Sequence, residues 1–326
     1  MKKILKYLLP IALGLGLFYW VFKDMDLMSI VQNFKDANYF LVSIGLFVAF
    51  VAHASRGVRW KLMLEPMGYK VSSLNATAGV LIGYMTNLVL PRAGELARSV
   101  SLQNTEEVPF EKSFGAVLAE RVIDVLVLLC LLVLNILLEF DRIKDLVMEL
   151  LGDKLKNTNA LLLLLIVAVV LFSILVFIYK KYKKRILAFA IFQKITTFLA
   201  GLWAGFSSVL KMEKPGMFVF HTVLIWSMYY LSTYILCMAV PLGQNVTPLA
   251  VLTILVMGSI GMAAPTIGGI GSYHLLVGKI MVLYGLSNEE GINLATFLHT
   301  MQGIIYVLLL GILGFAIAFF GKKKSA

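Results

Sequence analysis

The sequence predicts an all-α polytopic membrane protein in which the helices form an inverted repeat. Of its 326 residues, 60% are hydrophobic and only 14% are charged, and the mean hydropathy is +0.89. A soluble domain of this composition would have too little polar surface to cover itself. Several apolar runs reach the length of about 20 residues that a membrane-spanning helix needs. Two other apolar regions, one in each half, are interrupted by proline and glycine, which predicts broken helices.

Six uninterrupted apolar runs are predicted to be full spans. They cover residues 7–22, 39–54, 122–140, 160–179, 217–240 and 293–320. The first run follows a basic head and lacks a small-x-small cleavage site, so we expect it to remain as a helix. Residues 186–210 lie between two basic stretches, and we expect an interfacial helix there, with a further span as the alternative.

The basic residues predict how these spans are oriented. The net charge of +11 comes in short blocks between apolar runs, which indicates membrane topology and not nucleic-acid binding. The block "KKYKKR" marks the cytoplasmic side, and we expect both termini on that side of a bacterial cytoplasmic (inner) membrane. This arrangement closes only if each interrupted region crosses an even number of times. We therefore expect two re-entrant segments that enter from opposite sides and surround a central substrate site.

The predicted organisation is a single membrane domain over residues 1–326. Its parts are a first half (1–140, with re-entrant segment 74–98), a span plus cytoplasmic interfacial connector (160–215) and a second half (216–326, with re-entrant segment 248–286). Each half has a spanning helix, a broken segment and another spanning helix in the same order, which is typical of an inverted repeat.

The motif "NLVLPRAGELAR" places polar groups inside an apolar region. Pro91 removes a backbone donor and Gly94 permits a close approach or a positive φ, so we expect a turn before a new helix. Glu95 and Arg98 are three residues apart, share a helical face and are expected to pair. With Arg92 beside the helix start, the motif has the elements of a phosphate site. The alternative is an interfacial loop with snorkelling arginines.

The segment "AERVID" puts Glu120, Arg121 and Asp124 where a helix should already be entering the bilayer. Arg121 can pair with Asp124, which leaves a carboxylate for a cationic group or for another arginine such as Arg98. Charged groups at that depth are costly and indicate a functional site. The alternative is a helix that begins at Val122, with the two preceding charges in water.

Two further segments carry candidate site residues. In "SRGVRWK", Arg56, Arg59 and Trp60 are expected at a cytoplasmic helix end, as positive-inside residues with an interfacial aromatic. A lipid-headgroup contact is the alternative for this segment. In "APTIGGIGSYH", Pro265 ends one half-helix and the glycines allow an unwound turn before the next. His274 is either a proton site or headgroup donor, or a structural histidine.

The other histidines do not form a recognisable catalytic or metal motif. His53, His221 and His299 have no metal spacing with one another or with an acid. Hydrolase and nucleotide-binding motifs are also missing from the sequence. We therefore predict no metal, no cofactor and no catalytic residue.

Four segments together resemble one protein family. In their order and spacing, "RGVRWKLML", "NLVLPRAGELAR", "LAERVIDVLVL" and "APTIGGIGSYH" resemble the flippase-like integral membrane family related to the transmembrane region of lysylphosphatidylglycerol synthase. The resemblance implies a lipid-translocating domain with two inverted halves and paired re-entrant segments around a cavity open to lipid. The sequence ends without the cytosolic aminoacyl-transferring domain of the two-domain synthases, so synthase activity is not expected.

The resemblance also implies roles for individual residues. A set that contacts the substrate consists of Arg56, Arg59, Asn87, Arg92, Glu95, Arg98, Glu120, Arg121 and Asp124, to which the histidine argument adds His274. A structural or gating set consists of Pro91, Gly94, Pro265, Gly268, Gly269 and Gly271.

These expectations lead to a functional hypothesis. The protein would be a lipid flippase or scramblase that moves an anionic, aminoacylated or polyprenyl-phosphate-linked lipid between leaflets. The arginines would bind phosphate, and the acids would orient them or accept a cationic headgroup. The alternative is a membrane-embedded enzyme of lipid or glycan modification. Membrane lipids are the expected partners, nucleic acid is not, and the oligomeric state is open, with a homodimer as one candidate.

Overall fold

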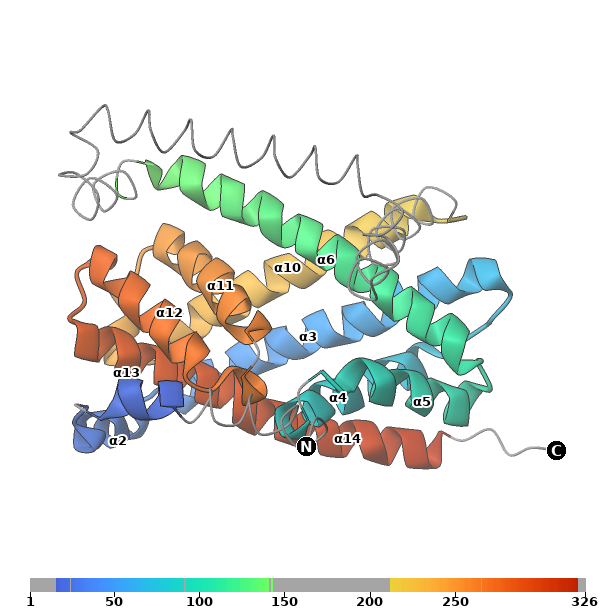
Figure 1. The fold of residues 1–326 in the computed structure, drawn as a ribbon, viewed down its shortest axis with the longest axis horizontal. Coiled ribbons are helices and arrows are strands. Elements are labelled where there is room, and N and C mark those ends of the chain that lie inside the picture. The colour runs from blue at the N-terminus through green and yellow to red at the C-terminus, as the bar shows by residue number, and fades with distance from the viewer. Residues whose placement is uncertain are drawn as a thin grey trace, which may run out of the picture.

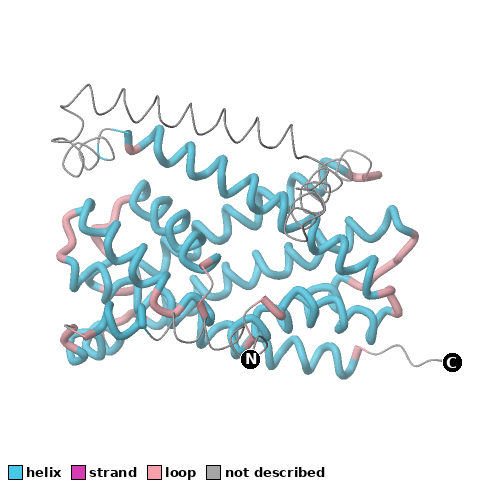
Figure 2. The backbone as a smooth tube through the Cα atoms, in the orientation of Figure 1, coloured by secondary structure: helices cyan, strands magenta, loops and turns pink. Residues whose placement is uncertain are grey.

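The computed structural model describes residues 16–23, 25–90, 92–140, 142, 212–264 and 266–321. In these ranges all regular structure is helical (Figures 1 and 2). The predicted span 160–179, most of the predicted span 7–22 and the predicted connector 186–210 lie outside the described residues. The same is true of Pro91 and Pro265, whose predicted roles are therefore not addressed.

Long apolar helices form the body of the protein. Five described stretches have the length and composition to cross a membrane: Tyr39–Met67, Phe110–Leu138, Pro215–Met238, Ile267–Tyr284 and Asn288–Phe320. They include α3 (Tyr39–Leu64), α6 (Phe110–Leu138) and α10 (Pro215–Met238), and a continuous rod of α13 (Asn288–Leu298), the π-helix η5 (His299–Ile305) and α14 (Tyr306–Phe320). The predicted spans that begin at residues 39, 122, 217 and 293 each fall on one of these stretches, which confirms them as long apolar helices.

Two helix boundaries differ from the expectation. Helix α3 continues beyond residue 54 to Leu64, so Arg56 and Arg59 lie within the helix and not at its end. Helix α6 begins at Phe110, so the alternative of a start at Val122 is wrong. In both cases the charges that appeared to end an apolar run are accommodated inside the helix bundle, because neighbouring helices supply their partners.

Both interrupted regions form helical hairpins. The first consists of α4 (Ser73–Val89) packed along α5 (Gly94–Glu106), and the second of α11 (Pro248–Ala263) packed along α12 (Ser272–Met281), with the short helix η3 (Ile267–Gly269) between them. The second turn has positive φ angles at all three of its glycines, 54° at Gly268, 77° at Gly269 and 81° at Gly271. Residues with a Cβ rarely adopt these angles, so the glycines predicted to unwind the helix do form its turn.

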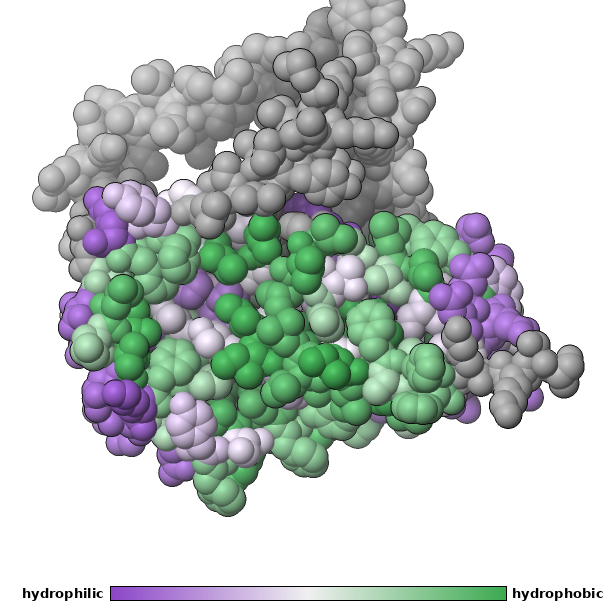
Figure 3. All heavy atoms as spheres, turned by 90° about the horizontal axis from the view of Figure 1, so that it is seen from below, coloured by the Kyte–Doolittle hydropathy of each residue, from purple (hydrophilic) through white to green (hydrophobic). Residues whose placement is uncertain are grey.

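The two hairpin turns contact each other. A Cβ added to Gly268 would lie 2.8 Å from the Cδ1 atom of Leu88, at the end of α4. In Figure 1 the first hairpin occupies the right half of the molecule and the second the left half. The face seen in Figure 3 has hydrophobic residues between polar groups at its two ends, as expected for helices that lie along the membrane normal.

Each half has its own hydrophobic core. The core of the first half includes Trp60, Leu102 and Val117, and the core of the second half includes Leu236 and Phe297. Helix α10 packs closely on α3 and joins the halves. Shorter elements complete the described fold: α2 (Leu27–Lys35), η1 (Glu65–Met67), η2 (Pro241–Gly243) and η4 (Val282–Tyr284).

Candidate functional site

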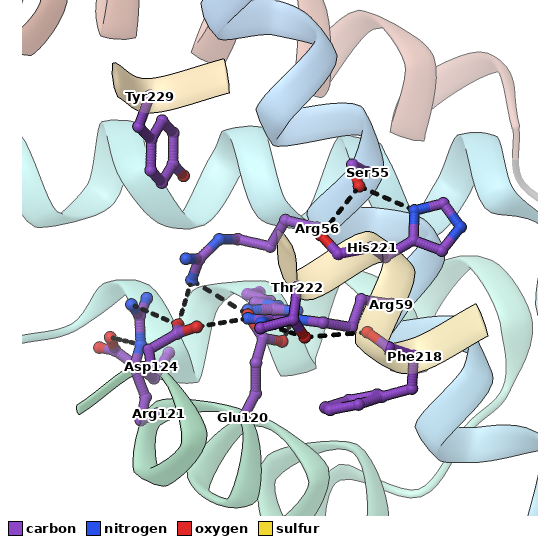
Figure 4. A network of polar contacts seen from close by, with 12 residues as sticks. Ser55, Arg56, Arg59, Glu120, Arg121, Asp124, Phe218, His221, Thr222 and Tyr229 are labelled. Atoms are coloured by element: carbon purple, nitrogen blue, oxygen red, sulfur yellow. Dashed lines mark hydrogen bonds and ion pairs between the residues drawn. The ribbon is translucent and has the colours of Figure 1, made fainter. Parts of the chain in front are cut away.

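Five charged side chains from three helices meet inside the first half. Figure 4 labels four of them, Arg56, Arg59, Glu120 and Asp124. Arg56 and Arg59 lie one turn apart on α3, Arg98 comes from α5, and Glu120 and Asp124 lie one turn apart on α6. All five are buried, and both Arg59 and Glu120 have no exposed surface. We call these five residues the buried charge cluster.

Each acid in the cluster is shared between arginines. Glu120 receives Arg98 at 2.7 Å on Oε2, and its Oε1 lies 3.0 Å from Arg56 and 3.2 Å from Arg59. Asp124 lies 2.6 Å from Arg59 through Oδ1 and 2.9 Å from Arg56 through Oδ2. Buried charges are tolerated only when they are paired and hydrogen-bonded. The spacing of three on α3 and four on α6 places each pair of charges on one helical face, so the sequence builds the cluster directly.

The cluster contains one more positive than negative charge, since three arginines face two acids. Neighbouring groups stabilise the surplus without neutralising it. The guanidinium of Arg98 lies 4.0 Å from the ring centre of Trp60, which is a cation–π contact, and Arg59 donates a hydrogen bond of 3.2 Å to the Thr222 hydroxyl. The buried cluster therefore keeps an excess positive charge that an anion would complement.

A further ion pair, which we call the edge pair, connects the cluster with the protein surface. Arg121 Nε lies 3.2 Å from Glu95 Oε1, and the two side chains are 37% and 22% exposed. Arg121 also lies 3.9 Å from Asp124, as predicted from their spacing. The edge pair thus connects the buried charges with the surface beside the first hairpin turn.

One predicted pair is wrong. Glu95 does not pair with Arg98, because Arg98 is buried and is bound by Glu120, whereas Glu95 lies at the half-exposed edge with Arg121. A fully buried guanidinium needs a carboxylate at its own depth, and α6 supplies one. The suggestion that an acid of α6 would meet Arg98 is confirmed.

The expected position of Arg56 and Arg59 at a helix end is also wrong, and so is that of Trp60 at the interface. All three are buried, Arg56 to 3% exposure and the other two completely. The sequence did not indicate this burial because Glu120 and Asp124, which neutralise the arginines, are distant in sequence.

The first hairpin turn is built by Asn87 and Gly94. The Gly94 amide donates a hydrogen bond of 2.7 Å to Asn87 Oδ1, and a Cβ on Gly94 would collide with the Gly83 carbonyl. Asn87 therefore supports the turn. Arg92 has a φ of 64° and is exposed, and it lies outside the ion pairs of the described residues. The turn is thus held together while its arginine remains accessible.

The second hairpin turn is held by neutral groups. They include His274 and a second histidine, His299, which the sequence did not indicate as a site residue. His274 is buried, accepts a hydrogen bond of 3.3 Å from the Gly271 amide at Nδ1, and contacts the His299 ring at 4.8 Å. His299 Nε2 lies 2.7 Å from the Gly268 carbonyl and must donate to it. His299 begins the π-helix η5, which is a frequent feature of functional sites. No sequence spacing indicated this contact, because it depends on tertiary packing.

The chain is similar in sequence to known membrane proteins. A family model described as the lysylphosphatidylglycerol synthase TM region matches residues 7–311. The UPF0104 membrane protein PH1989 of Pyrococcus horikoshii is 23% identical over 96% of both chains. The UPF0104 membrane protein MJ1595 of Methanocaldococcus jannaschii is 27% identical over 32% of both chains.

A shorter match has a different name. Glycosyltransferase AglD of Haloferax volcanii is 28% identical over 103 residues, which is 31% of this chain and only 16% of AglD. No solved structure gives a significant match.

Proposed function

The chain belongs to the lysylphosphatidylglycerol synthase transmembrane-region family, and on that premise we propose that it moves a lipid with an anionic headgroup between the two leaflets, as a flippase or scramblase. The observation that supports this proposal is the buried charge cluster with its surplus positive charge, set among apolar helices and connected to the surface by the edge pair. The candidate substrates are anionic phospholipids, their aminoacylated forms and polyprenyl-phosphate-linked lipids.

The edge pair is the proposed first contact with the headgroup. Arg121 is exposed enough to exchange Glu95 for a lipid phosphate, and a planar guanidinium can bind phosphate through two parallel hydrogen bonds. Asp124 lies 3.9 Å from Arg121 and continues to attract its guanidinium during the exchange. The buried arginines then supply a favourable potential, which falls off slowly in a medium of low dielectric constant.

The two hairpins are the proposed re-entrant segments of an inverted repeat. Their turns contact each other at Leu88 and Gly268, and the edge pair begins one residue after the first turn ends at Gly94. Transporters built from inverted repeats bind their substrates where paired broken helices meet, near the middle of the membrane. In this proposal both termini are cytoplasmic, and the first hairpin enters from that side of a bacterial inner membrane.

Reconstitution in liposomes tests the proposal. We expect purified protein to move fluorescent headgroup-labelled phosphatidylglycerol between leaflets, and Arg121→Gln to reduce the rate at least about tenfold, because a charge-assisted contact contributes roughly 1.5–3 kcal/mol. Arg142→Gln is the matched control, since Arg142 also pairs with an acid three residues away, Glu139 at 3.0 Å, directly after α6 and outside the cluster. Equal rates in both variants would reject the assignment of the edge pair.

A membrane-embedded enzyme of lipid or glycan modification is the second candidate. The observation that favours it is the partial similarity to a protein named as a glycosyltransferase. Mass spectrometry of the liposome lipids after the transport assay separates the two. A change in headgroup mass without translocation would support the enzyme, and translocation without a change in mass would support the transporter.

A further inference from the structure

A second feature of the first hairpin lies on a different face of α5. Helices α4, α5 and α14 enclose a groove with a volume of about 580 Å3. One wall is apolar and includes Phe315 and Phe319 of α14, which are 51% and 73% exposed. The other wall belongs to α5 and includes Ala97, Ser101 and Asn104, which recur at helical spacing on one face. The groove is therefore lined mainly by apolar surface, with polar side chains such as Ser101 and Asn104 on the α5 wall.

The ends of the groove can be placed from contacts between the helices. At the outer end, Asn75 of α4 donates a hydrogen bond of 3.3 Å to the carbonyl of Gly321, where α14 ends. At the inner end, a Cβ on Gly311 would collide with Met85, next to Thr86, which lines the groove. Along α5 the groove extends from Thr105 to Ala97, about 12 Å at 1.5 Å per residue. It thus runs from the end of a spanning stretch towards the first hairpin turn.

One buried polar group of the groove has no hydrogen-bond partner among the described residues. Ser101 is 9% exposed, and its hydroxyl makes no hydrogen bond with any described residue. The hydroxyls of Thr86 and Thr105, also in the groove, donate instead to the carbonyl four residues earlier, at 2.8 Å and 2.9 Å. A buried hydroxyl without this local bond is a site at which a ligand can accept a hydrogen bond.

We propose that this groove is a lipid furrow, in which the headgroup of a glycerophospholipid moves along the α5 wall from the membrane boundary to the edge pair while its acyl chains stay in the bilayer. The occupant is a membrane lipid because the apolar wall belongs to α14, part of the apolar stretch Asn288–Phe320. Ser101 donates to a phosphate or ester oxygen of the lipid. The furrow ends at Thr86, which precedes Asn87. Asn87 is hydrogen-bonded to Gly94, and Glu95 of the edge pair follows Gly94. This inference rests on the proposed function, because it supplies the route to the proposed headgroup site.

Thiol labelling from a lipid headgroup tests the furrow. The full-length protein, with Cys130→Ser and Cys237→Ala, is reconstituted in phosphatidylglycerol vesicles that contain phosphatidylethanolamine with a maleimide on its headgroup. Single cysteines are placed at Asn104 and Ala97 in the furrow, and at Ile312 as a control. Ile312 is 62% exposed, adjoins Gly311 at the depth of Met85 and does not line the groove.

We expect labelling at Asn104→Cys and Ala97→Cys, and labelling at least about tenfold slower at Ile312→Cys, because an ionised headgroup at that depth away from the polar side chains of the α5 wall is strongly disfavoured. Equal labelling of Ala97→Cys and Ile312→Cys would overturn the proposal. Labelling of Asn104→Cys alone would also overturn it, since the headgroup would then stop at the boundary. Protection of both furrow positions would show that another part of the chain occupies the groove.

A transport measurement separates failure of the furrow from failure of the proposed function. Ala97→Trp fills the furrow, whereas Leu96→Trp puts the same side chain on the neighbouring residue, which is 46% exposed and outside it. We expect only Ala97→Trp to slow translocation at least about tenfold, and Ser101→Ala to slow it about three- to tenfold, the effect of one hydrogen bond. Translocation that Ala97→Trp leaves unchanged would reject the furrow alone. Labelling in the furrow without any translocation would reject the proposed function alone.

Discussion

The two hairpins have the same helix–turn–helix form but are held in place by different chemistry. In the first, Arg98 of α5 binds Glu120 at 2.7 Å and Glu95 binds Arg121 at 3.2 Å. In the second, neutral groups do the equivalent work. Ser272 of α12 donates a hydrogen bond of 2.7 Å to the Gly261 carbonyl of α11, and His299 donates one of 2.7 Å to the turn.

The two hairpins differ in what happens when one contact is lost. A neutral hydrogen bond is satisfied pair by pair, so the second hairpin can lose one contact without leaving a charge behind. The ion pairs of the first hairpin are stable only as a set, because each acid balances more than one arginine. The buried charge cluster therefore lies beside the first hairpin, whereas the turn of the second hairpin is held by neutral hydrogen bonds.

Removing Glu120 from the first hairpin's charge cluster should have the largest effect on stability. Glu120→Ala leaves three buried arginines with Asp124 alone, and we expect a loss of about 3–5 kcal/mol in the free energy of unfolding, as for other broken buried pairs. Denaturant unfolding in detergent micelles measures it. Glu139→Ala is the control, because Glu139, directly after α6, is also a buried acid but pairs with one arginine whose side chain is 45% exposed. A similar loss in both variants would mean that the cluster has no special role.

The sequence predicted much of the first hairpin. The break at Gly94, the approach of an α6 acid to Arg98 and the family itself follow from motifs visible in the sequence, and all three are confirmed. The burial of Arg56 and Arg59 was not predicted. A charge that ends an apolar run looks the same in sequence whether water or a distant carboxylate receives it.

The second hairpin was predicted less completely. The glycines indicated its turn, since only backbone conformation was needed, and positive φ angles confirm it. The role of His299 required knowing that η5 lies against that turn, and its π-helical register is not visible in the residue pattern. Contacts that depend on how distant helices pack have no local signature in one sequence.

A change at His299 should have an intermediate effect and stay within the second hairpin. His299→Ala leaves the Gly268 carbonyl without its donor, and we expect a loss of about 1–3 kcal/mol in the free energy of unfolding. His299→Gln keeps a donor amide at a similar distance from the backbone and should recover part of the loss. Hydrogen exchange in the segment 267–271 should rise in His299→Ala and not in the first hairpin. A rise in both hairpins would show that the two turns open together through the contact of Leu88 with Gly268.

The smallest effect on stability is expected at Glu95, and it distinguishes a structural edge pair from a functional one. Glu95 and Arg121 are partly exposed, so the pair should contribute less than about 1 kcal/mol to folding. In Glu95→Gln, however, Arg121 loses the carboxylate that competes with lipid phosphate. We therefore expect tighter binding of short-chain phosphatidylglycerol in micelles, measured by calorimetric titration, with a gain that shrinks as salt screens the phosphate.

Glu289→Gln is the control for this last prediction, since it removes an exposed acid far from the cluster in sequence and should leave lipid affinity unchanged. Weaker lipid binding in Glu95→Gln would mean that Glu95 orients Arg121 for the headgroup instead of competing with it. Either change, with folding intact, would make the edge of the first hairpin a place where the lipid and the protein exchange partners.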